Sequence, residues 1–197
     1  TVVKPMIELI GKEKGVKRIA AANIMLTKRG TIFFSDTAIN IEPTAEELAD
    51  ICYMTALSMK MFGLEPNLAM LSFSNFGSSN SPLAERVSQA VAIMHKKHPD
   101  INVDGEIQAD FALNPKLLKE KFPFSKLNDK KVNGLIFPTL DAANIGYKLM
   151  KEFDQMVSIG PIIMGLQKPV HILQLGASVD EIVNMSCVAI VHAQEKK

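Results

Sequence analysis

The sequence predicts an α/β fold in which a mostly parallel sheet is flanked by helices. From Thr44 onward, short apolar runs typical of buried strands alternate with segments whose apolar residues recur at helical spacing. This alternation is typical of right-handed βαβ crossovers, which build parallel sheets between layers of helices. The chain has 197 residues, of which 47% are hydrophobic, so it can bury the core of one large domain.

Before Thr44, the chain is expected to form a short helix and then a β-hairpin. The helix is predicted around Pro5–Ile10. Val16–Leu26 is apolar, and Thr31–Asp36 is rich in the β-branched and aromatic residues that favour strands. The sequence KRG at 28–30 separates these two runs and is typical of a tight turn, so the runs are expected to pair.

Two long helices are expected next, because their first residues match capping patterns. Thr44 and Glu47 fit a capping box, in which the threonine hydroxyl accepts the Glu47 N–H and the glutamate side chain reaches back. Ser81 and Pro82 suit the N-cap and the first position of a second helix, which is expected to end before Pro99.

Strands are expected at three short apolar runs that follow helix or loop segments, namely Asn67–Phe73, Asn102–Ile107 and Leu135–Pro138. Two later apolar runs, Ile159–Leu166 and Pro169–Leu173, contain or border glycine and proline, which bend the path of the chain.

The second half of the chain is expected to contain further helices. Lys116–Lys131 is predicted as a short helix and a loop, and Asp141 is expected to cap a longer helix. Ser178 and Glu181 form a second capping box pattern. The final helix, Val179–Gln194, is apolar on most sides and is therefore expected to be largely buried. The helix that follows Asp141 carries the apolar residues Ile145, Leu149 and Phe153.

Polar residues gather where the predicted strands end, and above all in the loop Leu71–Pro82 (LSFSNFGSSNSP). Ligands of parallel sheets bind beyond the carboxyl ends of strands, and a helix start favours anions. Ordinary turn chemistry is the alternative explanation for the same residues. The candidate ligand-binding residues are Asp36, Asn40, Ser74, Asn75, Gly77, Ser78, Ser79 and Asn144.

Two clusters resemble metal sites but lack a supporting spacing. Asp104, Glu106 and Asp110 lie close in sequence, yet they match no metal-binding motif, so solvated loop carboxylates are the favoured interpretation. His95 and His98 lie among lysines at a helix end, where cations stabilise the helix dipole. We therefore expect no metal in this chain.

Composition and motifs exclude several classes of protein. The net charge of +1 argues against a nucleic-acid partner. No apolar run is long enough to cross a bilayer, so no membrane partner is expected. Cys52 and Cys187 lie in apolar helical patterns and are interpreted as small buried residues in a reducing compartment, so a cytoplasmic location is expected. Because the chain has no GxG, GxxxxGK[ST], CxxC or GxSxG, any activity needs a site assembled from loops.

From Gly30 to its end the chain resembles the phosphate acetyl/butyryltransferase family. Its SNFGSS, DGE and KPVHIL are most similar to the phosphotransacetylase-like C-terminal domain of large bacterial NADP-dependent malic enzymes. The resemblance implies a three-layer α/β/α fold like that of isocitrate and isopropylmalate dehydrogenases. It also implies that residues 1–197 are one phosphotransacetylase-like domain, comprising the second lobe and a returning C-terminal helix. Most of the N-terminal lobe and the malic-enzyme region would lie outside this chain. The matching segments are Thr31–Ala49, Phe62–Ser79, Val103–Asp110, Gly134–Leu149 and Ile159–Met185.

The family moves an acetyl group between phosphate and coenzyme A, for which a carboxylate deprotonates the thiol and positive charge stabilises phosphate and oxyanion. After the KPV motif, active transferases typically have Ser-Arg and then an aspartate. Gln174, Leu175 and Glu181 occupy these positions here. Leucine cannot stabilise a phosphate, and the simplest role of Glu181 is the capping box with Ser178. No catalytic residue is therefore expected.

The resemblance thus implies a regulatory and oligomerisation domain of an NADP-dependent malic enzyme. It would bind acetyl-CoA or a related acyl-CoA as an effector without turning it over, and it would form a homo-oligomer. The domain itself would need no cofactor, since NADP and a divalent metal are expected only in the malic-enzyme part. The alternative is an active phosphate acetyltransferase that uses Glu181 and a displaced cation such as Lys168 or His171.

Overall fold

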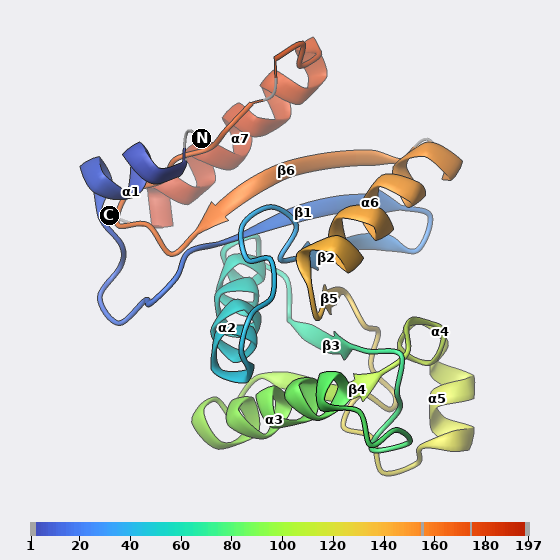
Figure 1. The fold of residues 1–197 in the computed structure, drawn as a ribbon. Helices are drawn as coiled ribbons and strands as arrows, with labels where there is room; N and C mark the ends of the chain where they lie inside the picture. Colours follow the sequence, from blue (N-terminus) through green and yellow to red (C-terminus); the bar gives the residue numbers. More distant parts are fainter. Residues whose placement is uncertain (1–2, 155, 174, 196–197) are drawn as a thin grey trace.

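The structure, a computed structural model, describes residues 3–154, 156–173 and 175–195, which form a six-stranded sheet and its helices (Figure 1). The strands are β1 (Ala20–Thr27), β2 (Gly30–Ser35), β3 (Asn67–Leu71), β4 (Asn102–Ile107), β5 (Gly134–Ile136) and β6 (Val157–Met164). The helices are α1 (Val3–Ile10), α2 (Ala45–Met61), α3 (Pro82–Lys97), α4 (Ala109–Ala112), α5 (Pro115–Lys121), α6 (Leu140–Asp154) and α7 (Val179–Glu195).

The strand order is β4-β3-β5-β2-β1-β6, and only β1 runs against the other described strands. The predicted hairpin is confirmed, since Thr27 pairs with Gly30 and Ala22 pairs with Ser35. β6 is antiparallel to β1 and therefore has the same direction as β2, β5, β3 and β4. The α/β fold with a mostly parallel sheet is thus as predicted.

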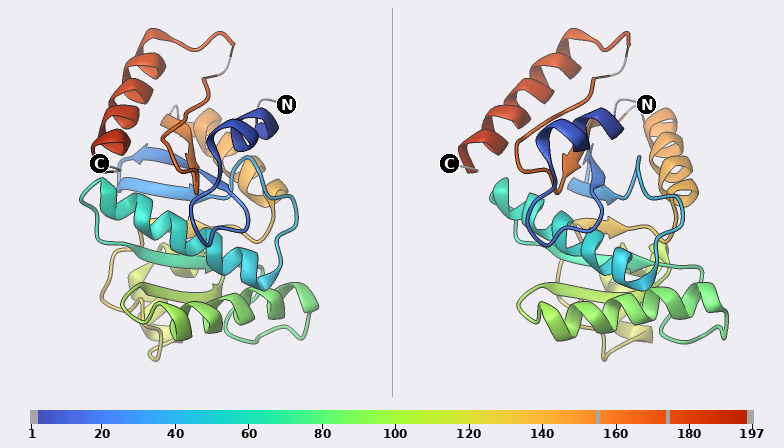
Figure 2. Two further views of the ribbon diagram at one scale, coloured as in Figure 1. Left: turned by 90° about the vertical axis from the view of Figure 1, so that its left-hand side faces the viewer. Right: turned by 60° about the vertical axis from the view of Figure 1, so that its left-hand side comes forward.

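Helices cover both faces of this sheet. α2 and α3 lie on one face, while α4, α5 and α6 lie on the other (Figures 1 and 2). Phe33 and Phe34 are adjacent in β2 and illustrate how both faces are packed. Successive side chains of a strand point to opposite faces of the sheet. Phe33 is buried in the cluster under α2 and α3, and Phe34 in the cluster under α4, α5 and α6. α1 buries Met6 in a third, smaller cluster with Ile163 of β6.

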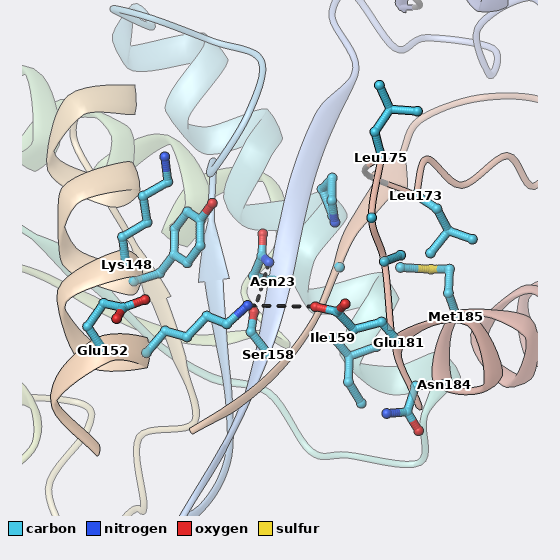
Figure 3. A pocket seen from close by; sticks show the side chains of 16 residues that line it. Asn23, Lys148, Glu152, Ser158, Ile159, Leu173, Leu175, Glu181, Asn184 and Met185 are labelled. Atoms are coloured by element: carbon cyan, nitrogen blue, oxygen red, sulfur yellow. Dashed lines mark hydrogen bonds and ion pairs between the residues drawn. The ribbon is translucent and has the colours of Figure 1, made fainter. Parts of the chain in front are cut away.

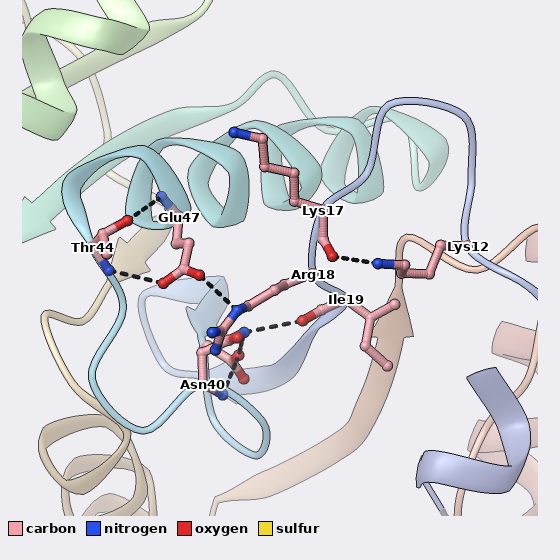
Figure 4. Close-up of polar contacts among 8 residues, drawn as sticks. Lys12, Lys17, Arg18, Ile19, Asn40, Thr44 and Glu47 are labelled. Atoms are coloured by element: carbon pink, nitrogen blue, oxygen red, sulfur yellow. Dashed lines mark hydrogen bonds and ion pairs between the residues drawn. The ribbon is translucent and has the colours of Figure 1, made fainter. Parts of the chain in front are cut away.

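Both expected capping boxes form. Thr44 Oγ1 accepts the Glu47 N–H, and Glu47 Oε2 accepts the Thr44 N–H at 2.9 Å. Figure 4 shows this capping box together with Arg18, whose Nε lies 2.6 Å from Glu47 Oε1. Ser178 and Glu181 make the same reciprocal pair at the start of α7. Each box satisfies amide groups that a helix start otherwise leaves without an acceptor.

Three details of the elements differ from the prediction. The hydroxyl of Thr139, rather than Asp141, caps α6 by accepting the Ala142 N–H at 3.3 Å. Strand β3 ends at Leu71, and Phe73 is more than half exposed because the chain turns into the polar loop two residues earlier. The short helix α4 was not predicted, since four residues are too few to display a helical period.

α6 and α7 both expose apolar side chains. Ile145, Leu149 and Phe153 lie on the exposed side of α6. α7 packs against β6 and α2 through residues such as Met185, but much of its surface is exposed, so the expectation that it is largely buried was wrong. The expected burial of Cys187 was also wrong, because its thiol is exposed, whereas Cys52 is buried as predicted. The exposed apolar side chains of α7 are those of Val179, Ile182, Val183 and Ile190. No described helix is long and apolar enough to cross a bilayer.

The loop after β2 is organised by the buried carboxylate of Asp36. Oδ1 accepts the N–H groups of Ala21, Ala38 and Ile39 at 3.0–3.2 Å, and Oδ2 accepts the Asn40 N–H at 3.0 Å. The side-chain amide of Asn40 donates to the same carboxylate and to the carbonyl of Ile19. A single side chain therefore satisfies three consecutive amides of the loop, those of residues 38–40.

The first prediction concerns this carboxylate. Asp36→Ala leaves buried N–H groups without an acceptor, so we expect a loss of about 3 kcal/mol in the free energy of unfolding. Urea denaturation measures it, and Asp110→Ala, which removes an exposed carboxylate, is the control. Equal denaturation midpoints for the two variants would contradict the role of Asp36.

The second prediction concerns the pH dependence of the α7 cap. The N–H and hydroxyl of Ser178, aided by Lys151, lower the pKa of Glu181 below its ordinary value. A carboxyl whose pKa is lowered by folding adds stability above its unfolded pKa and loses it as the pH falls through the folded pKa. Glu181→Gln keeps a capping side chain but cannot ionise.

We therefore expect wild type to exceed Glu181→Gln in stability near pH 6, by less than about 1 kcal/mol because the carboxylate is partly exposed. The difference should shrink as the pH falls below about 4, the ordinary pKa of a glutamate, and then through the lowered pKa of folded Glu181. Urea titrations at several pH values measure this difference, and a constant difference down to pH 3 would be inconsistent with the assigned interactions.

Candidate functional site

The loop that follows β3 is held by the buried side chain of Glu106 at the end of β4. Glu106 Oε1 accepts the hydroxyl of Ser74 at 3.0 Å and the N–H of Gly77 at 2.6 Å. Ser74 in turn accepts the Ser79 N–H at 3.1 Å. Phe76 and Gly77 adopt positive φ angles of 46° and 84°, which fold the chain back over this carboxylate.

Asn75 adds two further hydrogen bonds that hold the loop. Asn75 donates its N–H to Ser78 Oγ at 2.9 Å and accepts the Gln108 N–H at 2.8 Å. Internal hydrogen bonds therefore hold the loop in one conformation. A ligand would contact the loop atoms that these hydrogen bonds leave facing solvent.

The expectation of solvated carboxylates at the end of β4 was wrong for two of the three residues. Glu106 is only 1% exposed, because it lies beneath the loop. Asp104 is also buried and accepts the Ser125 hydroxyl and the Lys126 N–H, both at 2.8 Å. Only Asp110 is exposed. These two buried carboxylates hold loops in place rather than face water.

The structure places the predicted ligand-binding segments along one edge of the sheet. β2, β5 and β3 are adjacent and parallel, so the loops of Asp36 and Ser74 and the start of α6 with Asn144 leave from the same edge. Burial raises the pKa of Asp36 above its ordinary value, although its hydrogen bonds to residues 38–40 oppose the shift.

His95 near the end of α3 and His98 just after it have separate structural contacts. His95 Nε2 lies 2.8 Å from the carbonyl of Val103, and the ring of His98 stacks on Tyr53 with centroids 3.8 Å apart. In the described parts of the chain, no three histidine, cysteine, aspartate or glutamate side chains gather as a metal site requires.

A pocket of about 530 Å³ lies between α6, β6 and α7 (Figure 3). Leu175 and Glu181, two of the three positions expected from the family reaction, line it, whereas Gln174 lies outside the described residues. None of the eight predicted ligand-binding residues lines this pocket. It is lined by Asn23, Tyr147, Lys148, Lys151, Glu152, Ser158, Ile159, Gly160, Pro161, Leu173, Leu175, Gly176, Ala177, Glu181, Asn184 and Met185.

The floor of the pocket is linked to the loop after β2. Asn23 Nδ2 donates to Ser158 Oγ at 3.0 Å, and the Thr37 hydroxyl donates to Asn23 Oδ1 at 2.7 Å. Gly160 lets β6 approach this asparagine, because a Cβ at Gly160 would lie 2.9 Å from the carbonyl oxygen of Ala22 and from Asn23 Nδ2. The pocket floor is therefore a hydrogen-bonded part of the sheet.

Opposite charges face each other across the pocket. Lys151 of α6 has its Nζ 3.6 Å from Oε1 of Glu181 at the start of α7. Lys148 and Glu152 extend from the α6 wall, and Leu175 projects fully exposed from the opposite rim (Figure 3). This arrangement can bind an anionic group at the lysines and an apolar group along the rim.

The sequence did not identify Lys151 or its neighbour Tyr147 as site residues. Helical spacing places Lys148 and Lys151 on one side of a helix, but it cannot show that this side faces Glu181. Burial raises the pKa of Tyr147, which keeps its hydroxyl a hydrogen-bond donor. The displaced cations considered earlier, Lys168 and His171, do not line this pocket.

Known proteins resemble the chain over nearly its whole length. It is 42% identical to an NADP-dependent malic enzyme of Haemophilus influenzae over 96% of its own length and 25% of that protein. It is 37% identical to a phosphate acetyltransferase of Bacillus subtilis, with 97% of the chain and 59% of that protein covered. The crystal structure of a phosphotransacetylase from Streptococcus pyogenes superimposes with a TM-score of 0.92 at 37% identity, covering 98% of the chain and 59% of that structure.

The chain thus spans about a quarter of the malic enzyme and about three fifths of the two transferases. The model of the family described as "Phosphate acetyl/butaryl transferase" matches residues 1–190. Sequence, fold and family model agree, and this chain belongs to the phosphate acetyl/butaryl transferase family.

Proposed function

We propose that this chain is a regulatory domain that binds acetyl-CoA or a related acyl-CoA without turning it over. The observation that carries the proposal is the exposed leucine at position 175, on the rim of the pocket beside Glu181. The parent protein would be an NADP-dependent malic enzyme, whose NADP and divalent metal would bind outside these 197 residues. The similarity to the malic enzyme of Haemophilus influenzae supports this parent.

The chemistry of the pocket argues against turnover. Acyl transfer to or from phosphate needs positive charge at the leaving phosphate and the oxyanion, and the loss of one such donor slows catalysis about 10²–10³-fold. Leu175 offers no charge and no hydrogen-bond donor. Glu181 is engaged in the α7 cap, and its lowered pKa makes it a weaker base for a thiol.

The same pocket is suited to binding. Lys148 and Lys151 can hold phosphate groups, while the rim residues Leu173, Leu175 and Met185 can contact the apolar part of an acyl-CoA. The eight residues predicted from the sequence, from Asp36 to Asn144, remain proposed contacts. They line the carboxyl edge of the sheet, where a ligand as long as coenzyme A could extend.

Assembly into a homo-oligomer belongs to the same proposal. The exposed apolar side chains of α6 and α7, such as Phe153 and Ile190, are candidate contacts, since interface cores are enriched in apolar and aromatic residues. A regulatory effect on malate oxidation would require that acyl-CoA bind two states of the assembly with different affinities.

A working phosphate acetyltransferase is the second candidate function. One observation favours it, because the amino group of Lys151 lies 3.6 Å from Glu181 and could supply charge that Leu175 lacks. The similarity to the phosphate acetyltransferase of Bacillus subtilis is compatible with this function. In that case Glu181 would be the base and Lys151 would stabilise the departing phosphate.

Calorimetric titration tests binding directly. We expect acetyl-CoA to bind the purified chain with measurable heat and to raise its melting temperature, because ligand binding to the native state stabilises it. Lys148→Met should weaken this binding, and Lys126→Met, a lysine outside the pocket, should leave it unchanged. No heat and no thermal shift at millimolar acetyl-CoA would contradict the proposed function.

A substitution at position 175 separates the two candidate functions. Wild type should form no acetyl-CoA from acetyl phosphate and CoA, whereas Leu175→Arg should bind acetyl phosphate about tenfold more tightly, because a guanidinium pairs with phosphate. Leu83→Arg, an exposed leucine on α3, controls for added charge. If wild type already forms acetyl-CoA steadily, the second candidate function is correct and the first is wrong.

A further inference from the structure

We propose that the Lys151–Glu181 ion pair is an internal latch, which occupies the amino group of Lys151 in the free protein and opens when a phosphate group of the ligand takes Lys151. This inference rests on the proposed acyl-CoA site and concerns its regulation. Glu181 would act as a built-in competitor for the phosphate, and its carboxylate would set the affinity of the site.

The two oxygens of the Glu181 carboxylate have different partners. Oε2 accepts the Ser178 N–H at 2.8 Å and so belongs to the cap of α7. Oε1 lies 3.6 Å from Lys151 Nζ, on the other wall of the pocket. Lys151 can therefore leave without disturbing the cap, and α7 keeps its first turn when the pair breaks.

The strength of the pair suits a latch. The side chains of Lys151 and Glu181 are 45% and 43% exposed, and their charged atoms are 3.6 Å apart. Exposed pairs of this kind are weak, since water and salt screen them. A phosphate group carries more charge than a carboxylate and offers more acceptor oxygens, so it is the stronger partner for one ammonium.

The remaining charges of the pocket define what the ligand meets. Lys148, Lys151, Glu152 and Glu181 are its charged lining residues, so the two lysines are opposed by two carboxylates. Of the two carboxylates, Glu181 is the one paired with a lysine across the pocket. Removing its charge should therefore expose Lys151 to phosphate and also remove a repulsive neighbour.

The latch also links α6 to the start of α7, so a ligand that opens it would act on both elements. Lys151 is on α6, and Glu181 follows the segment of Gly176 and Ala177, which lines the pocket. Opening the pair removes one link between α6 and the start of α7. Ligand binding at this site is thereby coupled to the attachment of α7, whose outer surface is apolar and exposed.

Binding measurements on four proteins test the latch: wild type, Glu181→Gln, Lys151→Met and the double variant. The probes are inorganic phosphate, acetyl phosphate, acetyl-CoA and pantetheine, which has no phosphate. Glu181→Gln should bind the three phosphate-bearing probes about two- to fivefold more tightly, the size expected for loss of an exposed competing charge. Lys151→Met should bind them at least about fivefold more weakly.

Pantetheine should bind wild type and Glu181→Gln equally, because it has no group that competes for Lys151. The double variant should show no tightening relative to Lys151→Met. Asp129→Asn is the matched control, since it removes the carboxylate of another exposed ion pair, with Lys119, and asparagine tolerates the positive φ of 62° at that position. It should leave all affinities unchanged.

The outcomes separate the latch from the proposed function. If acetyl-CoA binds but Glu181→Gln binds it no more tightly than Asp129→Asn does, the latch is refuted and the binding function stands. If acetyl-CoA fails to bind while inorganic phosphate binds Glu181→Gln more tightly, the latch stands and the acyl-CoA function is wrong. Failure of every phosphate-bearing probe to bind any variant overturns both.

Discussion

The insertion of β1 between β2 and β6 is the constraint on which the candidate site depends. β1 is the one described strand that runs against its neighbours, and its two antiparallel ladders fix the position of β6. Asn23, in the middle of β1, joins Ser158 of β6 to Thr37 of the loop after β2. With β6 fixed there, α6 and α7 become the two walls of one pocket.

The chain has the scaffold of its family, in which buried carboxylates hold two loops at the edge of the sheet. The polar loop after β3 is held by the buried Glu106, and the loop after β2 is held by the buried Asp36. At the pocket, by contrast, Leu175 is apolar and Glu181 is shared between a helix cap and Lys151. The scaffold is that of a transferase family, and the proposal of binding without turnover rests on these side chains of the pocket.

Much of this fold could be predicted from local sequence signals. The capping boxes at Thr44 and Ser178 are encoded within four residues, so they can be recognised without tertiary information. The hairpin turn at 28–30 and the alternation of strands and helices are likewise local patterns. Phe33 and Phe34 lie on opposite faces of the sheet because side chains alternate along a strand.

The candidate site depended on contacts between distant residues, and these could not be predicted. Glu106 looked like an exposed loop carboxylate, because nothing near it in sequence reveals that the loop of Ser74 folds over it. Lys151 and Glu181 are thirty positions apart on different helices, and only the fold brings them together. The apolar pattern of α7 indicated burial, but a pattern cannot show whether a partner surface is present.

The central claim is that this pocket recognises an acyl-CoA and does not process it. Exchange of labelled inorganic phosphate into acetyl phosphate in the presence of CoA tests it most directly, because exchange requires the complete forward and reverse acyl transfer. With acetyl-CoA binding verified in the same sample, the account predicts no exchange above the protein-free rate. Exchange that increases in proportion to the protein concentration would contradict it.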